Sequence, residues 1–210
     1  MARLAVLVSG SGSNLQAILN AVEARTIAAE VAVVISNKPG VRALERAVKA
    51  GVPALCLSHQ NYPSREAFDA ALVTELKARN VDWVVLAGFM RLLTKVFLDE
   101  FRDRVLNLHP SLLPAFPGVN SARQALDHGV KVTGCTVHLV TEGMDAGPII
   151  AQQAVPVLDD DTEESLLERL HQAEHELLVS VVAAVCDGGL TVERPMDQVS
   201  ARAKVRLNER

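Results

Sequence analysis

The sequence predicts an α/β protein with a Rossmann-like, mostly parallel central sheet and helices on both faces. Short runs rich in β-branched residues alternate with longer amphipathic stretches, which is typical of parallel α/β folds. The first run, Leu4–Val8, is apolar at every position rather than at every second one, as expected for a strand buried on both faces. A glycine-rich turn, Ser9–Asn14, follows at once and leads into a helical pattern.

The first half of the sequence repeats this alternation of strand and helix. The first helix has apolar residues three and four positions apart, and Gly51 and Pro53 mark the end of the second. Helices are expected at residues 13–24, 41–50, 64–79 and 94–101, and further strands at 31–36, 54–57, 83–87 and 105–108.

The pattern changes at residues 107–118, which contain three prolines and no periodicity, so a loop of functional length is expected there. Thr162 opens the last helix, with Ser165 or the charges of Glu163 and Glu164 supporting its start. A short helix, two strands and this long helix are expected at 121–128, 133–140, 148–158 and 162–186. The charged segment 194–210 is expected to be a loosely held tail, after a single domain of residues 1–193 with halves at about 1–100 and 101–193.

The composition argues against several classes of protein. Hydrophobic residues make up 49% and charged residues 22% of the 210 residues, as in globular rather than disordered proteins. The net charge of −4 argues against a nucleic acid as the main partner. The 3 cysteines form no CxxC pair, which fits a reducing compartment. No apolar run is long enough for a signal peptide or a membrane span, so a cytoplasmic location is expected.

The glycine-rich turn Ser9–Asn14 is the first candidate binding site. Glycine allows a ligand to approach the backbone closely, and the N–H groups that open a helix favour an anion such as phosphate. The alternative is a tight turn that needs glycine only for its dihedral angles. Leu15 stands where the dinucleotide fingerprint needs glycine, and no GK[ST] follows as in a Walker A loop.

Two further segments supply an amide, an imidazole and a carboxylate. Asn107 and His109 are two residues apart at the end of an expected strand, so their side chains point to the side where parallel sheets bind ligands. Pro110 biases His109 toward extended geometry. Asp145 lies in the turn-rich segment 141–148, and a carboxylate beside His109 would favour the charged imidazole. Each residue alone is also consistent with a strand-end cap, a surface histidine or an ordinary turn.

Residues 171–175 match the HxxEH pattern of inverted zinc peptidases. His171 and His175 would share one helix face, as metal ligation requires. The sequence carries no other feature of such peptidases, so the match is expected to be incidental and no metal is expected.

Taken together and in order, six segments resemble the folate-dependent phosphoribosylglycinamide formyltransferases of purine biosynthesis, over about residues 2–190. They are SGSGSNLQAIL (9–19), ISNK (35–38), SREAF (64–68), VVLAGFMRLL (84–93), LNLHPSLLPAFPG (106–118) and VTEGMDAGP (140–148). The resemblance implies the formyltransferase fold, with a phosphate-binding first half and a folate-binding and catalytic second half. It also implies transfer of the formyl group of 10-formyltetrahydrofolate, a co-substrate, to the amine of phosphoribosylglycinamide without a metal.

The resemblance also implies roles for individual residues. Asn107, His109 and Asp145 correspond to the catalytic trio of the family. The positions implied in binding phosphoribosylglycinamide are Gly12, Ser13, Asn14 and Glu174, and this role of Glu174 competes with the zinc interpretation. The positions implied in binding folate are Arg65, Met90, Arg91, Leu92, Leu93, Asn107, Thr141, Glu142 and Asp145. Residues 119–122 lack the histidines that some relatives carry, so the contacts of that loop do not transfer.

Two other interpretations stay open. Methionyl-tRNA formyltransferase and formyltetrahydrofolate hydrolase share the HPSLLP segment, but each is expected to carry an additional domain that a chain of this length has no room for. A non-catalytic phosphate- or nucleotide-binding module on the same scaffold would leave Asn107, His109 and Asp145 unexplained. Small molecules are the expected partners, with neither nucleic acid nor membrane, and the protein is expected to be a monomer or a homodimer.

Overall fold

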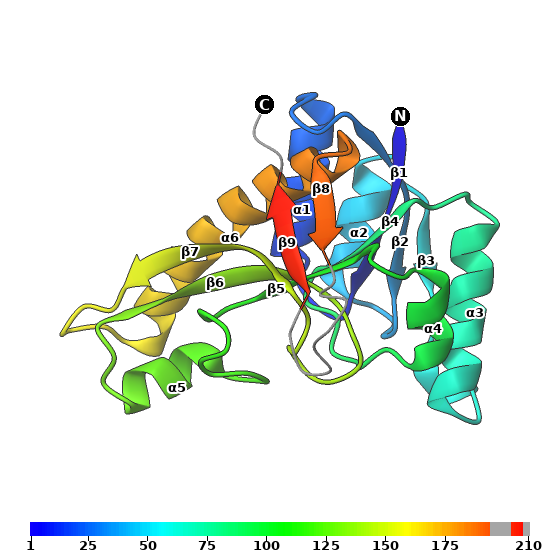
Figure 1. Ribbon diagram of the computed structural model, residues 1–210. Coiled ribbons are helices and arrows are strands. Elements are labelled where there is room, and N and C mark those ends of the chain that lie inside the picture. Colours follow the sequence, from blue (N-terminus) through cyan, green and yellow to red (C-terminus); the bar gives the residue numbers. More distant parts are fainter. Residues whose placement is uncertain (194–202, 208–210) are drawn as a thin grey trace. The chain divides into compact units, whose positions relative to one another are not determined.

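The computed structural model describes residues 1–193 and 203–207 (Figure 1). The chain divides into two compact units, Met1–Asn107 and Leu108–Arg210. The division falls after Asn107, inside the strand Val105–His109, so Asn107 is in the first unit and His109 is in the second.

The first unit alternates strands and helices. Its strands pair in parallel, the first with the second and the fourth, the second with the third, and the fourth with the fifth. The strands are β1 (Ala2–Val8), β2 (Ala29–Ser36), β3 (Ala54–Cys56), β4 (Trp83–Leu86) and β5 (Val105–His109). The helices are α1 (Ser13–Glu23), α2 (Arg42–Lys49), α3 (Arg65–Lys77) and α4 (Lys95–Glu100), with a 3-10 turn η1 (His59–Asn61) after β3.

The core of the first unit is centred on β1. All five residues of the run Leu4–Val8 have no exposed surface, because helices cover both faces of the sheet. The chain runs from β1 outward to β3 and then returns to β4 on the other side of β1. Right-handed crossovers therefore put α1 and α2 on one face and α3 and α4 on the other. The contacts of α1 with α2 and of α3 with α4 agree with this arrangement.

The second unit is built on an antiparallel strand pair and a long helix. The pair is β6 (Val132–Leu139) and β7 (Ile149–Pro156), preceded by the short helix α5 (Ser121–Asp127). Helix α6 (Glu163–Cys186) packs on both strands. Its N-cap Thr162 accepts from the N–H of Ser165 at 3.2 Å, while the Ser165 hydroxyl accepts from the N–H of Thr162 at 3.1 Å. The predicted capping of this helix by Ser165 is therefore confirmed.

The strands are hydrogen-bonded in the order β3-β2-β1-β4-β5-β6-β7. This mostly parallel sheet with helices on both faces confirms the predicted fold class. The strand order reverses at β1, and in parallel α/β sheets the loops that leave the strands at such a point form the ligand crevice. Those loops are residues 9–12 and 87–94. Within the described part of the chain, no helix has the length and apolar character needed to cross a membrane.

Part of the C-terminal segment, which was expected to be a loosely held tail, forms a strand. Strand β9 (Lys204–Leu207) pairs antiparallel with β8 (Leu190–Glu193) and contacts β7 and α6. Its half-buried residues are Val205 and Leu207. Two apolar positions that alternate with Lys204 and Arg206 are too short a pattern to identify a strand from sequence. Residues 194–202 and 208–210 of the predicted tail lie outside the described residues.

Candidate active site

The glycine-rich turn enters α1 through a backbone conformation that requires glycine. Gly12 is the N-cap of α1 and has a φ of 75°. A Cβ atom on Gly12 would lie 2.7 Å from the Cβ and 2.9 Å from the Cα of Ala43. As the N-cap residue, Gly12 has no side chain that could cap the start of α1. The N–H groups and the positive end of the dipole at a helix start favour an anion, as the phosphate hypothesis requires.

Helix α2 holds this turn in shape. The Nε of Arg46 donates to the carbonyl oxygen of Ser11 at 2.9 Å, and its Nη1 donates to Oε1 of Gln16 at 2.9 Å. The backbone N–H of Ala43 donates to the carbonyl oxygen of Gly10 at 3.2 Å. Sequence motifs gave no role to Arg46, because an arginine on an amphipathic helix is ordinary. The turn is thus preorganised by its packing on α2.

The segment Met90–Leu93, which the resemblance assigns to folate, follows β4 in the same unit. Nη2 of Arg65 donates to the carbonyl oxygen of Leu92 at 2.8 Å, so Arg65 supports this segment directly. The guanidinium of Arg91 lies 5.4 Å from the ring centre of Phe68 on α3. The side chains of Met90 and Leu92 are 66% and 47% exposed, whereas Leu93 is buried. Leu93 could therefore contact a ligand mainly through its backbone.

The second unit brings His109 and Asp145 together. Nδ1 of His109 lies 3.4 Å from Oδ2 of Asp145, and the exposed fractions of these side chains are 5% and 12%. Asn107 precedes His109 by two positions on β5, so alternation along the strand points both side chains the same way. Thr141 and Glu142, also assigned to folate, are exposed in the loop between β6 and β7.

Asp145 is the centre of a small polar network. Its Oδ2 accepts from the N–H of Gly118 at 2.8 Å, and its Oδ1 lies 3.7 Å from Nε2 of His138. Burial alone would raise the pKa of Asp145, but the contacts with His138, Gly118 and His109 outweigh burial and lower that pKa below its ordinary value. Asp145 also has a φ of 50°, a strained conformation of the kind found at functional sites.

The other ring nitrogen of His109 faces the proline-rich loop. Nε2 lies 2.9 Å from the carbonyl oxygen of Phe116 and 3.3 Å from Oγ of Ser121. A carbonyl oxygen is only an acceptor, so Nε2 of His109 carries the hydrogen in this contact. Donation from Nε2 to a substrate therefore requires that the carbonyl of Phe116 move away. Phe116 has a φ of 51°, so its backbone is strained where this movement is required.

Two residues of this network were not predicted. His138 is a buried residue of the largely buried strand β6, and Ser121 is the buried first residue of α5. A histidine, the one ionisable ring in a strand of apolar and small residues, is a signal that could have identified His138 from sequence. Ser121 stands in the 119–122 segment that departs from some relatives, and only the folded chain shows its contact with His109.

The lowered pKa of Asp145 predicts a pH-dependent stability. A carboxyl group whose pKa is lower in the folded than in the unfolded chain stabilises the fold above its ordinary pKa of 3.8, and this stabilisation is lost as pH falls through the lowered value. The free energy of unfolding of the wild type should thus exceed that of Asp145→Asn at pH 6, and the difference should shrink below pH 4. Denaturant unfolding of both proteins over this pH range measures it. A constant difference would contradict the assignment.

The three side chains of the HxxEH pattern do not meet on α6. Glu174 is 5% exposed, His171 is exposed, and the rings of His171 and His175 lie with their centres 6.5 Å apart. In residues 1–193 and 203–207, no three metal-binding side chains are grouped as a metal site.

Burial, together with the charge of Glu174, raises the pKa of the Cys135 thiol to about 12, so this cysteine stays protonated.

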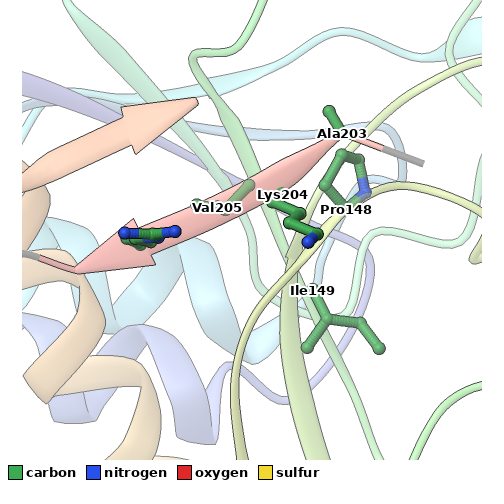
Figure 2. A pocket seen from close by; sticks show the side chains of 6 residues that line it. Pro148, Ile149, Ala203, Lys204 and Val205 are labelled. Atoms are coloured by element: carbon green, nitrogen blue, oxygen red, sulfur yellow. The ribbon is translucent and has the colours of Figure 1, made fainter. Parts of the chain in front are cut away.

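A shallow pocket of about 370 Å³ lies in the second unit, where β9 passes the start of β7 (Figure 2). It is lined by Pro148, Ile149 and residues 203–206. None of these residues belongs to the network around Asp145, and the lining contains no acid–base pair. The pocket therefore adds nothing to the candidate active site.

Comparisons with known proteins identify relatives among the formyl transferases and the proteins of purine biosynthesis. The formyl transferase family matches residues 2–182. A phosphoribosylglycinamide formyltransferase of Mycobacterium tuberculosis is 50% identical over 191 residues, covering 91% of this chain and 88% of that protein. The trifunctional purine biosynthetic protein adenosine-3 of Drosophila melanogaster is 53% identical over 188 residues, but this chain spans only 14% of its length.

A solved structure gives the same answer as the sequences. Glycinamide ribonucleotide transformylase 1 of Symbiobacterium toebii superposes with a TM-score of 0.93 at 51% identity, over 100% of this chain and 95% of that one. The family match covers both units, from β1 to α6. The chain therefore belongs to the formyl transferase family, among the phosphoribosylglycinamide formyltransferases.

Proposed function

We propose that the chain transfers the formyl group of 10-formyltetrahydrofolate to the amine of 5'-phosphoribosylglycinamide, in purine biosynthesis. The observation that carries this proposal is the buried pair of His109 and Asp145, with Asn107 two positions before the histidine on β5. The names of the relatives, at about half of the residues identical, support the choice of substrates. The expectations of small-molecule partners, a cytoplasmic location, and a monomer or homodimer form part of the same proposal.

The chemistry requires no covalent enzyme intermediate. The neutral amine of the ribonucleotide attacks the formyl carbon, and the carbonyl oxygen becomes a tetrahedral oxyanion. Collapse of this intermediate breaks the bond from carbon to N10, while the attacking nitrogen loses a proton and N10 gains one. Catalysis then depends on donors directed at the oxyanion, on a proton source and on alignment of the two substrates.

Three residues can meet these needs. The side-chain amide of Asn107 can donate to the oxyanion. The N–H group on Nε2 of His109 can donate to that oxygen and then supply a proton. Asp145, fixed by the N–H of Gly118, orients the imidazole through Nδ1. Release of Nε2 from the carbonyl of Phe116 would make the donor available when substrate is bound.

The remaining predicted residues supply binding. Gly12, Ser13 and Asn14 at the start of α1 would hold the phosphate, and Glu174 would contact the ribonucleotide. Residues 90–93, 141 and 142, together with Arg65, would contact folate. Arg65 has a second role in this assignment, because its guanidinium also supports the carbonyl of Leu92.

Replacing Gly12 with alanine should weaken ribonucleotide binding selectively. The new Cβ would collide with Ala43 in a backbone conformation that alanine disfavours, so the turn must shift. The KM for phosphoribosylglycinamide should rise about 10- to 100-fold, with that for 10-formyltetrahydrofolate nearly unchanged. Gly40→Ala is the matched control, since Gly40 has a φ of 64° and no atom within 4 Å of an added Cβ. An unchanged ribonucleotide KM in Gly12→Ala would argue against the phosphate site.

Steady-state absorbance separates the possible functions. The proposed enzyme should release tetrahydrofolate only when phosphoribosylglycinamide is present. A hydrolase would release it without the ribonucleotide, and a non-catalytic binding module would show no turnover. Unchanged activity after treatment with a chelator would argue against a zinc enzyme.

A further inference from the structure

Two buried side chains to which the resemblance assigns no role fix the ends of the segment Met90–Thr94. The backbone N–H of Met90 donates to Oγ of Ser9 at 2.9 Å, and the N–H of Thr94 donates to Oδ2 of Asp69 at 2.5 Å. Ser9 and Asp69 are 6% and 2% exposed. Each bond therefore has a buried acceptor side chain, and each joins elements far apart in sequence.

The hydroxyl of Ser9 has a fixed direction. It donates its single hydrogen to Oδ1 of Asn37 at 2.6 Å, which leaves its lone pairs to accept from Met90. Asn37 is itself 2% exposed, at the end of β2. Ser9 is also the first residue of the glycine-rich turn. The first residue of the glycine-rich turn after β1 therefore also holds the loop that follows the neighbouring strand β4.

Asp69 anchors the other end of the segment from α3. Its burial raises the pKa of the carboxyl group, opposed by the hydrogen bonds of Thr94 and by the charges of Arg65 and Arg91. Burying a carboxylate is unfavourable for stability, and an apolar side chain would fill this part of α3 at lower cost. A carboxylate at position 69 is explained if fixing the backbone of Thr94 contributes to function, even though burial of Asp69 lowers the stability of the fold.

We propose that Ser9 and Asp69 are positioning residues that hold the backbone of residues 90–94 in the shape that binds the pterin of folate. The inference rests on the proposed function, which assigns this segment to folate. Neither side chain need touch a substrate. Both act on backbone groups at the two ends of the segment, while Arg65 supports the carbonyl of Leu92 between them. Preorganisation of this kind lowers the free energy that binding must spend on ordering a loop.

The test compares the KM for 10-formyltetrahydrofolate with the KM for phosphoribosylglycinamide in variants of Ser9 and Asp69. Ser9→Ala and Asp69→Ala should each raise the KM for 10-formyltetrahydrofolate about tenfold, because a backbone N–H loses its partner. Their KM for phosphoribosylglycinamide and their kcat at saturating folate should stay within about twofold of wild type. Asp69→Asn should restore most of the loss, since its amide oxygen can still accept from Thr94.

Ser36→Ala is the matched control. Ser36 is a fully buried serine at the end of the neighbouring strand β2, and its hydroxyl contacts only the backbone of Lys38 among the hydrogen bonds described. It should leave the folate KM unchanged. A rise in the ribonucleotide KM of Ser9→Ala, an unchanged folate KM, or an equal effect of Ser36→Ala would overturn the inference. If Asp69→Ala does not fold, Ser9→Ala decides alone. Failure of the proposed function is distinct, because the wild type itself would then show no ribonucleotide-dependent transfer.

Discussion

Replacing His109 with alanine should lower kcat about 10²- to 10⁴-fold, the usual range for loss of a general acid. Asp145 holds His109 on one ring nitrogen, and the loop carbonyl of Phe116 holds it on the other. The KM for phosphoribosylglycinamide should change little, because the proposed phosphate contacts are on α1. Rapid-quench measurement with saturating substrates gives the rate of the chemical step directly.

The control for this variant is His171→Ala, which removes an exposed histidine from α6 and should retain full activity. His109→Gln adds a finer test, since glutamine keeps an N–H donor but cannot supply a proton under these conditions. It should recover part of the rate if oxyanion stabilisation matters beside proton transfer. A His109→Ala enzyme with the wild-type rate would remove the histidine from the mechanism.

Replacing Asn107 with alanine should lower kcat about 10²- to 10³-fold, as expected for loss of one oxyanion donor. The pairing of Asn107 with Leu86 in the parallel ladder is a backbone property and survives the change. Asn107→Asp keeps the size of the side chain but replaces the donor with an acceptor. Its kcat should therefore be no higher than that of Asn107→Ala. Near-normal activity of Asn107→Asp would show that the amide N–H is not used.

The fold could be predicted from sequence because its strands are buried on both faces. The run Leu4–Val8 is continuously apolar and becomes the fully buried centre of β1. The capping of α6 was equally visible, since Thr162 and Ser165 interact across three positions in the chain. Local periodicity and local hydrogen bonds carry such information, so the elements that were predicted lie within a few residues of their expected bounds, whereas the short strands β8 and β9 were not predicted.

The network of the candidate site depends on contacts that local patterns do not encode. The folded loop around Phe116 and the turn between β6 and β7 bring His109, Gly118 and Asp145 together. Ser9 is the first residue of the candidate phosphate turn and received no role of its own from sequence, although its hydroxyl joins Asn37 and Met90. Spacing along the chain predicts the residue types of a site, but tertiary packing decides which partner each residue has.

Transfer of a labelled formyl carbon tests the central claim most directly. Wild-type protein is mixed in a single turnover with phosphoribosylglycinamide and 10-formyltetrahydrofolate that carries ¹³C in its formyl group, and the ribonucleotide is recovered. Our account predicts that the label appears on the glycinamide nitrogen in the wild type and in His171→Ala, and that His109→Ala forms this product at a rate lower by about 10² or more. Label recovered only as free formate, or equal transfer by the wild type and His109→Ala, would contradict it.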